Sequence, residues 1–390
     1  MKVVQINAVC GQGSTGKICL SISRLLDAKG IENYIIYSGK DQKIQNAITC
    51  ASKYYIKIQA LKSHLFGNYG FNSIFETKKI IAELNRISPK IVHLHNLHGH
   101  NCNLDILFKY LKNKGIKVYW TFHDCWAFTG YCTHYDMIGC DAWETECGKC
   151  PQRKTYSYFF DKSNALFHKK KQLFKGLDLT IITPSEWLAD QVKKSFLKDY
   201  PIKVINNGID LDVFSRTDNK KYDFNGKKVV LGVAFGWGER KGLDVFQRLA
   251  HDLDEKYCVV MVGTNKKIDS YLPDNVVSIH RTTNQSELAS LYSMADVLVN
   301  PTREENFPTV HLEALACGTP VVSYDTGGCK EMLSSDTGIV VAKNDYEALL
   351  KAVKRVCEDG DFSHEKCRKQ AEQYDQMMCF KKYIELYDNN

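Results

Sequence analysis

The 390-residue sequence lacks any apolar run that approaches the roughly 18 residues of a membrane-spanning helix. Its first residues, MKVVQINAVCGQG, give only a short apolar run before glycines appear, which is typical of a first strand and not of an export signal. Low-complexity segments and solenoid-type repeats are also absent. The composition, 44% hydrophobic and 25% charged, is that of a globular protein, and the length favours two domains.

Cysteine is the unusual feature of this composition, because the chain has 15 of them. Most stand alone inside apolar segments, as Cys19, Cys258 and Cys317 do, where a thiol acts as a small core side chain. Without an export signal we expect a reducing, cytoplasmic location and no general disulfide framework. One cluster differs, and it consists of Cys132, Cys140, Cys147 and Cys150. For this cluster a structural zinc site, free buried thiols and disulfides all stay open.

Charge is unevenly divided along the chain. Residues 1–205 hold 29 Lys and Arg against 16 Asp and Glu, a net charge of +13. The totals of 52 and 45 leave 23 and 29 for residues 206–390, a net charge of −6. The basic residues are dispersed, which argues against a nucleic-acid binder. A basic half does suit an anionic membrane, and the segment 153–177, rich in lysines and aromatics, is either an ordinary amphipathic surface helix or one that lies on a membrane.

Short apolar runs alternate with longer amphipathic runs, and the pattern occurs twice. The apolar runs are residues 2–9, 33–38, 90–95, 117–122, 179–185 and 203–208, then 228–235, 257–264, 276–280, 295–302 and 319–325. Nearly all-apolar strands separated by helices predict parallel sheets covered on both faces. Two sets predict an α/β protein with two doubly wound domains, 1–205 and 206–371. Ligands of such sheets bind beyond the carboxyl ends of the strands, so we expect the functional residues there.

The stretch VCGQGSTGKI, residues 9–18, is close to a phosphate-binding P-loop. Ile18, however, stands where such a loop needs Ser or Thr to hold magnesium. We therefore favour a glycine-rich loop at a helix N-terminus, in which Gly11, Gly13 and Gly16 let the backbone approach an anionic ligand. The alternative is a tight turn that binds nothing.

A second pattern lies in PTREENFPTVHLEALACGTP, residues 301–320. Pro308 suits a first helical turn and Gly318 a helix stop, so we predict a helix from Pro308 to Cys317. Glu313 would then lie within this helix and Glu305 on the loop before it. The positive end of the helix dipole could receive a diphosphate, with the two carboxylates reaching sugar hydroxyls and a ribose.

These motifs together carry a resemblance to a known family. The segment ADVLVNPTREENFPTVHLEALACGTPVVSYDTGGCKE is similar to the donor-site signature of retaining glycosyltransferases of family four, which have the GT-B fold. Further segments resemble the family in the same order, namely GSTGKI, WTFHDCWAFTG, TPSEWLADQV, NNGIDLDVF and VLGVAFGWGERKGLDVF. The resemblance implies two Rossmann-like domains facing a cleft that holds the active site. It also implies that residues 372–390 return to the N-terminal domain, which carries the Cys-rich insertion 125–152.

The implied reaction moves a sugar, with retention, from a nucleotide-diphosphate donor to a hydroxyl of a glycan acceptor. The expected acceptor is lipid-linked, the default carrier is uridine diphosphate, and the expected setting is bacterial surface-polysaccharide assembly at the inner face of the membrane. We identify no Asp-x-Asp pair of the kind that holds a manganese-bound nucleotide, so we expect no cofactor for catalysis. A nucleotide-sugar epimerase on the same fold is the alternative; no pyridoxal-phosphate lysine motif supports a phosphorylase.

The resemblance assigns roles in the C-terminal half. Glu305 would contact the transferred sugar and Glu313 the ribose, while Arg240 and Lys241 would neutralise the departing diphosphate. The family often has an arginine where this chain has Gly236, so the role of Arg240 departs from the pattern. The donor-binding residues implied in all are Gly13, Gly16, Arg240, Lys241, Arg281, Asn306, Phe307, Thr309 and Glu313.

In the N-terminal half the resemblance places His123, directly after the strand 117–122, beside the reacting sugar. Asp124 would orient His123 or the acceptor, and no nucleophile is identified. The histidine-rich stretch 93–101 lacks a carboxylate at a metalloenzyme spacing, which argues against a catalytic metal. We expect acceptor contacts there instead, from His95, Asn96 and His98.

Overall fold

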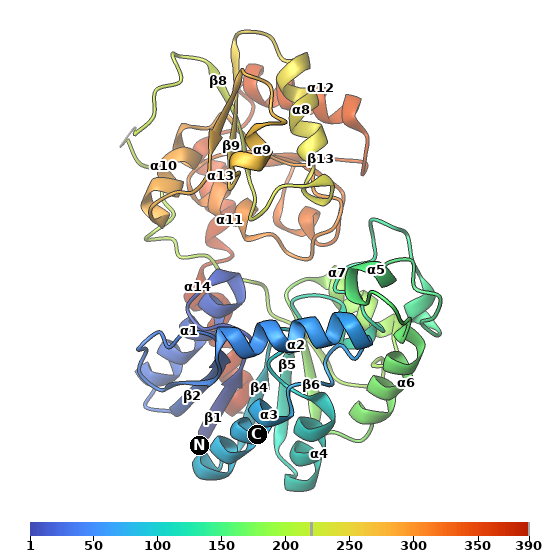
Figure 1. The fold of residues 1–390 in the computed structure, drawn as a ribbon. Coiled ribbons are helices and arrows are strands. Elements are labelled where there is room, and N and C mark those ends of the chain that lie inside the picture. The colour runs from blue at the N-terminus through green and yellow to red at the C-terminus, as the bar shows by residue number, and fades with distance from the viewer. Residues whose placement is uncertain (219–220, 389–390) are drawn as a thin grey trace. The chain divides into compact units, whose positions relative to one another are not determined.

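The computed structural model describes residues 1–218 and 221–388, which form two compact units (Figure 1). Unit 1 comprises residues 1–206 together with 379–390, and unit 2 comprises residues 207–378. The division between them lies one residue beyond the predicted end of the first domain at 205. The predicted C-terminal segment 372–390 is split, because its residues up to Met378 cluster with unit 2. Its last two residues lie outside the described ranges.

Unit 1 is built on a seven-stranded parallel sheet in the order β3-β2-β1-β4-β5-β6-β7. The strands are β1 Lys2–Ile6, β2 Glu32–Ser38, β3 Ala47–Ala51, β4 Ile91–Leu94, β5 Lys117–Thr121, β6 Leu179–Thr183 and β7 Ile202–Val204. The helices are α1 Gly13–Ala28, α2 Lys53–Phe66, α3 Ile74–Ile87, α4 Leu104–Lys114, α5 Arg153–Tyr156, α6 Ser163–Phe174, α7 Glu186–Lys194 and α14 Gln376–Asp388, with 3-10 turns η1 Trp126–Phe128 and η2 Ala142–Glu144. The strand order reverses between β1 and β4, which is where ligands of such sheets bind.

Unit 2 is built on a six-stranded parallel sheet in the order β10-β9-β8-β11-β12-β13. Its strands are β8 Lys228–Val233, β9 Tyr257–Val262, β10 Val276–Ile279, β11 Val297–Asn300, β12 Val321–Tyr324 and β13 Gly338–Val341. Its helices are α8 Leu243–Asp252, α9 Lys266–Asp269, α10 Gln285–Met294, α11 Thr309–Ala316, α12 Tyr346–Glu358 and α13 His364–Glu372, with 3-10 turns η3 Glu239–Lys241 and η4 Cys329–Met332. Here the order reverses between β8 and β11.

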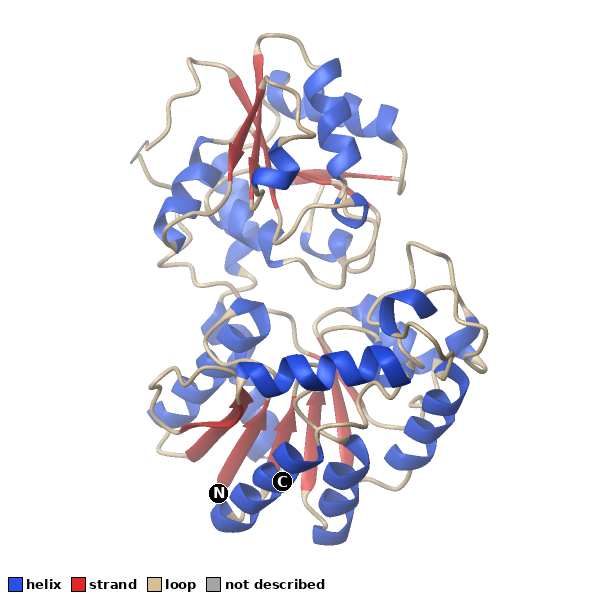
Figure 2. Ribbon diagram, in the orientation of Figure 1, coloured by secondary structure: helices blue, strands red, loops and turns tan. Residues whose placement is uncertain are grey.

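Both sheets are layered between helices (Figure 2). Every residue of β6 and β9 is buried, as expected for strands that helices cover on both faces. The apolar runs missed the edge strands β3 and β13, which are only partly buried, but they predicted the other described strands, because burial on both faces leaves no polar alternation. The predicted α/β class with two doubly wound domains is confirmed.

Helix α14 ends the chain on the sheet of unit 1. The Tyr119 hydroxyl donates to the Leu386 carbonyl at 2.7 Å, and the Tyr387 hydroxyl lies 2.5 Å from Nδ1 of His93. Both tyrosines and His93 are buried. The last turns of the chain therefore pack against β4 and β5, the two strands that carry the histidine-rich segments.

The lysine-rich segment 153–177 is not one helix, contrary to the prediction. It forms α5 and α6 with an irregular stretch between them. Within this stretch the Asp161 carboxylate accepts from the backbone N–H of Cys150 at 2.7 Å and of Ser163 at 2.9 Å, just before α6 begins. None of the helices that the structure describes combines the length and apolar character that a membrane crossing requires.

Candidate active site

The glycine-rich loop after β1 is not built as a P-loop. Helix α1 begins at Gly13, so the residues up to Gly16 already lie in its first turn and leave no wide loop to wrap a phosphate. The Gly11 N–H donates to the Gly16 carbonyl at 3.0 Å, and a Cβ on Gly16 would stand 3.1 Å from the Gly11 nitrogen. Ile18 is buried in the core. The glycines make a tight strand-to-helix turn with Gly13, at φ +62°, on its open side.

Histidines from two strand ends meet in unit 1. Nδ1 of His95, just after β4, lies 3.1 Å from Nε2 of His123, just after β5, and their rings are stacked. The other ring nitrogen of His95 lies 3.2 Å from Oε1 of Gln5. Both His95 nitrogens are therefore occupied, and the residue is buried. His123 is only partly buried. The buried His95 therefore holds the ring of His123 in place through this contact, while His123 keeps an exposed edge.

A carboxylate completes this cluster. Nε2 of His98 lies 2.7 Å from Oδ2 of Asp124, and Oδ1 of Asp124 accepts from the Trp126 N–H at 2.9 Å. Burial alone would raise the pKa of Asp124, but the nearby His98 lowers it to about 2. Asp124 is thus ionised at neutral pH. Asn96, the third predicted acceptor residue, is tied to the β1 end, where the Asn7 side chain accepts from its N–H at 3.1 Å.

The rings of His95 and His123 are neutral at pH 7. Burial lowers the pKa of His123 to about 4, although Asp124 opposes the shift. Burial also holds the pKa of His95 well below its ordinary value. A neutral imidazole can donate one hydrogen bond and accept another, which suits sugar hydroxyls and not a phosphate. The deeper His93 contacts Thr121 at 2.8 Å and Tyr387, so it belongs to the core.

In unit 2 the strand ends bring fixed charges together. Nζ of Lys241, in the turn after β8, lies 2.5 Å from Oε2 of Glu305, in the loop after β11, and both side chains are about a fifth exposed. Gly242, at φ +76°, allows this approach, because a Cβ there would stand 2.5 Å from the Pro301 ring. The Arg303 N–H also donates to the Arg240 carbonyl at 2.9 Å. The two predicted segments, 64 residues apart, thus form one structure.

Arg303, which the sequence analysis did not identify, holds the turn after β8 and the loop after β11 together. Arg303 forms a two-pronged ion pair with Asp244, with both N–O distances at 2.7 Å. It also donates to the Glu239 carbonyl at 2.5 Å. Arg240 itself is exposed, and its guanidinium donates to the Glu304 carbonyl at 3.4 Å. Arg303 is therefore the anchor, whereas Arg240 presents its charge to solvent.

Helix α11 follows Glu305 closely. It spans Thr309–Ala316 with Pro308 at its N-cap and the left-handed Gly318 after its end, within one residue of the predicted bounds. Oε2 of Glu313 accepts from the Tyr292 hydroxyl at 2.8 Å, which fixes the carboxylate in place. Oε1 of Glu305 accepts from the Asn306 N–H at 3.1 Å. Both predicted carboxylates therefore flank the N-terminal turns of α11.

A buried histidine on α11 was also missed. Nε2 of His311 lies 2.9 Å from Nδ2 of Asn300, the last residue of β11. Burial lowers the pKa of His311 to about 4, although the nearby Glu305 opposes this shift. The residue is thus a neutral support beneath the Glu305 loop. The spacing of three between Pro308 and His311 could have placed it on the inner face of the helix.

Other predicted donor residues fare differently. The Phe307 ring packs against Tyr374 at 5.8 Å and is buried, and the Phe307 carbonyl accepts from the Asn207 side chain at 3.3 Å. Only its backbone N–H is left to meet a ligand. Asn306 is buried and Thr309 partly exposed. Arg281 is exposed and follows β10, an edge strand two places from β8, and its donor contact stays a prediction.

The Asp-x-Asp spacing does occur in the chain, although the sequence analysis identified no such pair of the kind that holds a manganese-bound nucleotide. The pairs are 210/212, 252/254 and 359/361. Oδ1 of Asp210 accepts from the N–H groups of Asp212 and Val213 at 3.1 and 3.2 Å, and Arg355 contacts both members of the last pair. Asp252 accepts from the Tyr346 hydroxyl at 2.8 Å. These aspartates serve local turns and ion pairs.

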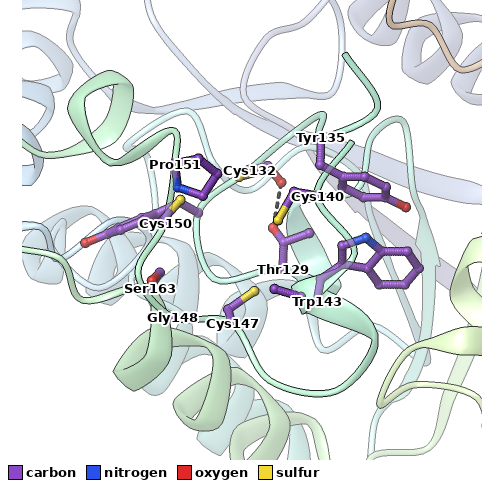
Figure 3. A pocket seen from close by; sticks show the side chains of 12 residues that line it. Thr129, Cys132, Tyr135, Cys140, Trp143, Cys147, Gly148, Cys150, Pro151 and Ser163 are labelled. Carbon is purple, nitrogen blue, oxygen red and sulfur yellow. Dashed lines mark hydrogen bonds between the residues drawn. The ribbon is translucent and has the colours of Figure 1, made fainter. Parts of the chain in front are cut away.

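The four clustered cysteines lie around one small cavity in the insertion (Figure 3). Across residues 1–218 and 221–388, no three His, Cys, Asp or Glu side chains are already set at metal-ligand spacing. The zinc site therefore stays a prediction.

The comparisons with known proteins agree with this geometry. The family model "Glycosyltransferase Family 4" matches residues 15–213, and "Glycosyl transferases group 1" matches residues 214–374. Over its full length, and that of the relative, the chain is 25% identical to the putative colanic acid biosynthesis glycosyl transferase WcaC of Escherichia coli. It is 29% identical, over 43% of the chain and 46% of the relative, to the N,N'-diacetylbacillosaminyl-diphospho-undecaprenol alpha-1,3-N-acetylgalactosaminyltransferase of Campylobacter jejuni.

Solved structures share the fold across the whole chain. Sucrose-phosphate synthase of Thermosynechococcus elongatus superposes with a TM-score of 0.74 at 16% identity, covering 100% of this chain and 98% of that one. Anabaena HepE in complex with UDP and glucose gives a TM-score of 0.73 at 13% identity, with both chains covered in full. The predicted GT-B fold is confirmed, and the family models make the chain a glycosyltransferase that belongs to Glycosyltransferase Family 4.

Proposed function

We propose that the enzyme transfers a sugar, with retention and without a catalytic metal, from a nucleoside-diphosphate donor to a hydroxyl of a glycan acceptor. The observation that carries this proposal is the Lys241–Glu305 pair, set beside the N-terminal turns of α11. Lys241, the exposed Arg240 and the positive end of the α11 dipole supply the charge that a departing diphosphate needs. HepE, whose complexes hold UDP and UDP-glucose, supports uridine diphosphate as the carrier.

In this proposal Glu305 has two partners in turn. It holds Lys241 extended before the donor binds, and it accepts a hydrogen bond from a hydroxyl of the transferred sugar once Lys241 turns to the diphosphate. Glu313, fixed by Tyr292, accepts from the ribose. The acceptor oxygen forms its bond to the anomeric carbon on the face from which the phosphate oxygen departs, and the acceptor proton passes to that phosphate oxygen. The configuration is retained, and the balance needs no added base.

The cluster of unit 1 binds the sugar and acceptor hydroxyls, which carry no charge. His123 hydrogen-bonds a sugar hydroxyl, and His95 positions it, since both nitrogens of His95 are engaged. Asp124 stays ionised and, with His98 and Asn96, orients the acceptor.

We place the reaction in bacterial surface-polysaccharide biosynthesis with a lipid-linked acceptor, at the inner face of the membrane. The relative WcaC is named for colanic acid biosynthesis, and the Campylobacter relative for an undecaprenol-linked acceptor. Both names support the proposal.

A surface of unit 1 suits the membrane contact. Tyr54, Ile58 and Leu61 recur on one face of α2 and are more than half exposed, at 81%, 52% and 56%. Lys53, Lys57 and Lys62 stand beside them on the same helix. An apolar stripe flanked by lysines lies well in an anionic interface. We therefore assign the membrane contact to α2 in place of the broken segment 153–177.

The α2 assignment is tested by flotation with vesicles of phosphatidylcholine and phosphatidylglycerol. We expect the wild type to float with them and not with phosphatidylcholine alone, and Leu61→Glu to stay behind. Tyr271→Glu, at an exposed apolar residue of unit 2, is the matched control and should float. Equal flotation of Leu61→Glu and wild type would remove α2 from the contact.

The donor site is tested by thermal shift with nucleoside diphosphates in the absence of divalent metal. We expect one diphosphate to stabilise the protein and Glu313→Ala to weaken its effect, while Tyr292→Phe weakens it less because the carboxylate remains. The configuration of the product, read by NMR with the matched donor, tests retention. Conversion of the donor sugar without any acceptor would indicate an epimerase, and a shift with ATP and magnesium alone would indicate a P-loop enzyme.

A further inference from the structure

The insertion that follows His123 and Asp124 has little regular structure to hold it. Between residues 125 and 152 the chain forms only the 3-10 turns η1 and η2. It is nevertheless well connected to the site, because the Cys125 N–H donates to the Thr133 carbonyl at 2.9 Å and the Thr133 N–H to the Tyr156 hydroxyl at 3.1 Å. Something other than helix or sheet must order this segment.

All four cysteines of the cluster face one cavity of about 20 Å³. Figure 3 shows the sulfurs of Cys132, Cys140, Cys147 and Cys150 turned toward the same space from different parts of the loop. The rest of the lining includes Thr129, Tyr135 and Trp143 but no carboxylate and no histidine. The space suits one small ion or one water molecule, and a water would need polar partners that four sulfurs supply poorly.

Hydrogen-bond donors lie close to these sulfurs. The Gly130 N–H donates to Sγ of Cys147 at 3.3 Å, and the Cys132 and Cys150 thiols share a hydrogen bond. The buried ammonium of Lys170 lies next to the cluster, donating to the Trp126 and Thr129 carbonyls at 2.7 and 3.0 Å. All four cysteines are free of disulfides.

We propose that Cys132, Cys140, Cys147 and Cys150 bind one zinc ion as a closed, structural site. Four thiolates around zinc form a tetrahedral site without an open position for catalysis. Since the sulfurs are not yet at ligand spacing, they close on the ion by rotation about their single side-chain bond. The ion cross-links the two ends of the insertion and adds to the order that its buried aromatic side chains, such as Phe128 and Trp143, already supply.

The test is the metal content of the wild-type protein purified in a thiol reductant. We expect about one zinc per chain by mass spectrometry of the elements, as a site of four thiolates holds one ion. Cobalt substitution should give the thiolate-to-metal absorption and the visible bands of a tetrahedral centre. Cys140→Ser and Cys150→Ser should each lose the zinc. Cys102→Ser, a buried cysteine of the same unit outside the cavity, should keep it.

Two outcomes would overturn the proposal. Protein without zinc, in which all 15 cysteines of the chain titrate after unfolding, would mean free thiols. A deficit of titratable thiols, reversed by strong reduction, would mean disulfides. If the serine variants fail to fold, release of zinc from the wild type by a mercurial reagent, read with a metal-sensitive dye, decides the question. The readout is metal and not transfer, so its failure would leave the proposed function standing.

Discussion

The two units carry different side chains at the carboxyl ends of their parallel strands, mostly neutral ones in unit 1 and charged ones in unit 2. In unit 1 the strand ends carry neutral, stacked imidazoles with a single carboxylate, and in unit 2 they carry the cations Arg240 and Lys241 with the carboxylates Glu305 and Glu313. The unit 2 group lies where the strand order reverses, between β8 and β11, and the unit 1 group follows β4 and β5, next to the reversal between β1 and β4. The fold therefore fixes where ligands are met, and the side chains decide which part of a ligand each unit meets.

The central pair of side chains is charged in unit 2 and neutral in unit 1. The Lys241–Glu305 pair is joined by loops that Arg303 and Gly242 lock together, so its charges are fixed and partly exposed. The His95–His123 pair is held neutral by burial. A diphosphate needs fixed charge, whereas hydroxyls need groups that donate and accept. The following experiments try to break this division.

Lys241→Ala should have the largest effect. Losing one fixed cation at a developing phosphate charge should lower kcat by about 10²- to 10³-fold. Lys241→Arg should restore part of the loss, and UDP affinity measured by calorimetry should fall in the alanine variant. Lys228→Ala removes the exposed partner of Asp296 in the same unit and should leave activity unchanged. Normal turnover in Lys241→Ala would refute the charge role of unit 2.

A double-mutant cycle of His123→Ala and Glu305→Gln tests whether both units contact one donor. We expect kcat/KM to fall in each single variant and the losses to be non-additive, with an interaction free energy of roughly 0.5–3 kcal/mol. His123→Ala with Lys228→Ala serves as an uncoupled control. Strict additivity of the first cycle would mean that the two clusters act on different molecules.

Acid should destabilise unit 1 more than unit 2. Burial lowers the pKa of His93 to about 3 and of His100 and His123 to about 4 in unit 1, and of His311 to about 4 in unit 2. Between these values and the ordinary pKa near 6.5, the unfolded chain binds more protons, so stability is lost as pH falls through that window.

Hydrogen exchange at pH 7 and pH 5, compared by peptide after correction for intrinsic rates, measures this difference. Protection should fall more in β4 and β5 than in β8 and β11. His251→Gln, at a largely exposed residue, should leave the comparison unchanged. The same pKa shift predicts that kcat/KM shows no acid inflection near 6.5 from His123. Equal loss of protection in both units would contradict the neutral-histidine description.

The sequence predicted the helices and strands better than the contacts between them. Runs buried on both faces predicted the strands except the partly buried edge strands β3 and β13, and Pro308 and Gly318 predicted α11, because these signals are local. The Lys241–Glu305 contact joins segments 64 residues apart, and no local signal encodes it. Phe307 could not be assigned to the core from its motif alone. The place of Arg281 could not be judged from the sequence, because strand order, which sets β10 at the edge of its sheet, is a tertiary property that a list of strands does not contain.

Arg281→Ala should therefore have the smallest effect of the series. The residue is exposed after the edge strand β10, and β9 stands between that strand and β8. We expect kcat/KM and UDP affinity to stay within about twofold of wild type, as for surface substitutions away from special contacts. Arg240→Ala, with its charge beside Lys241, should lose more. If the two variants lost activity equally, the charged site of unit 2 would extend along the sheet to β10, and the contrast with the compact histidine cluster of unit 1 would have to be redrawn.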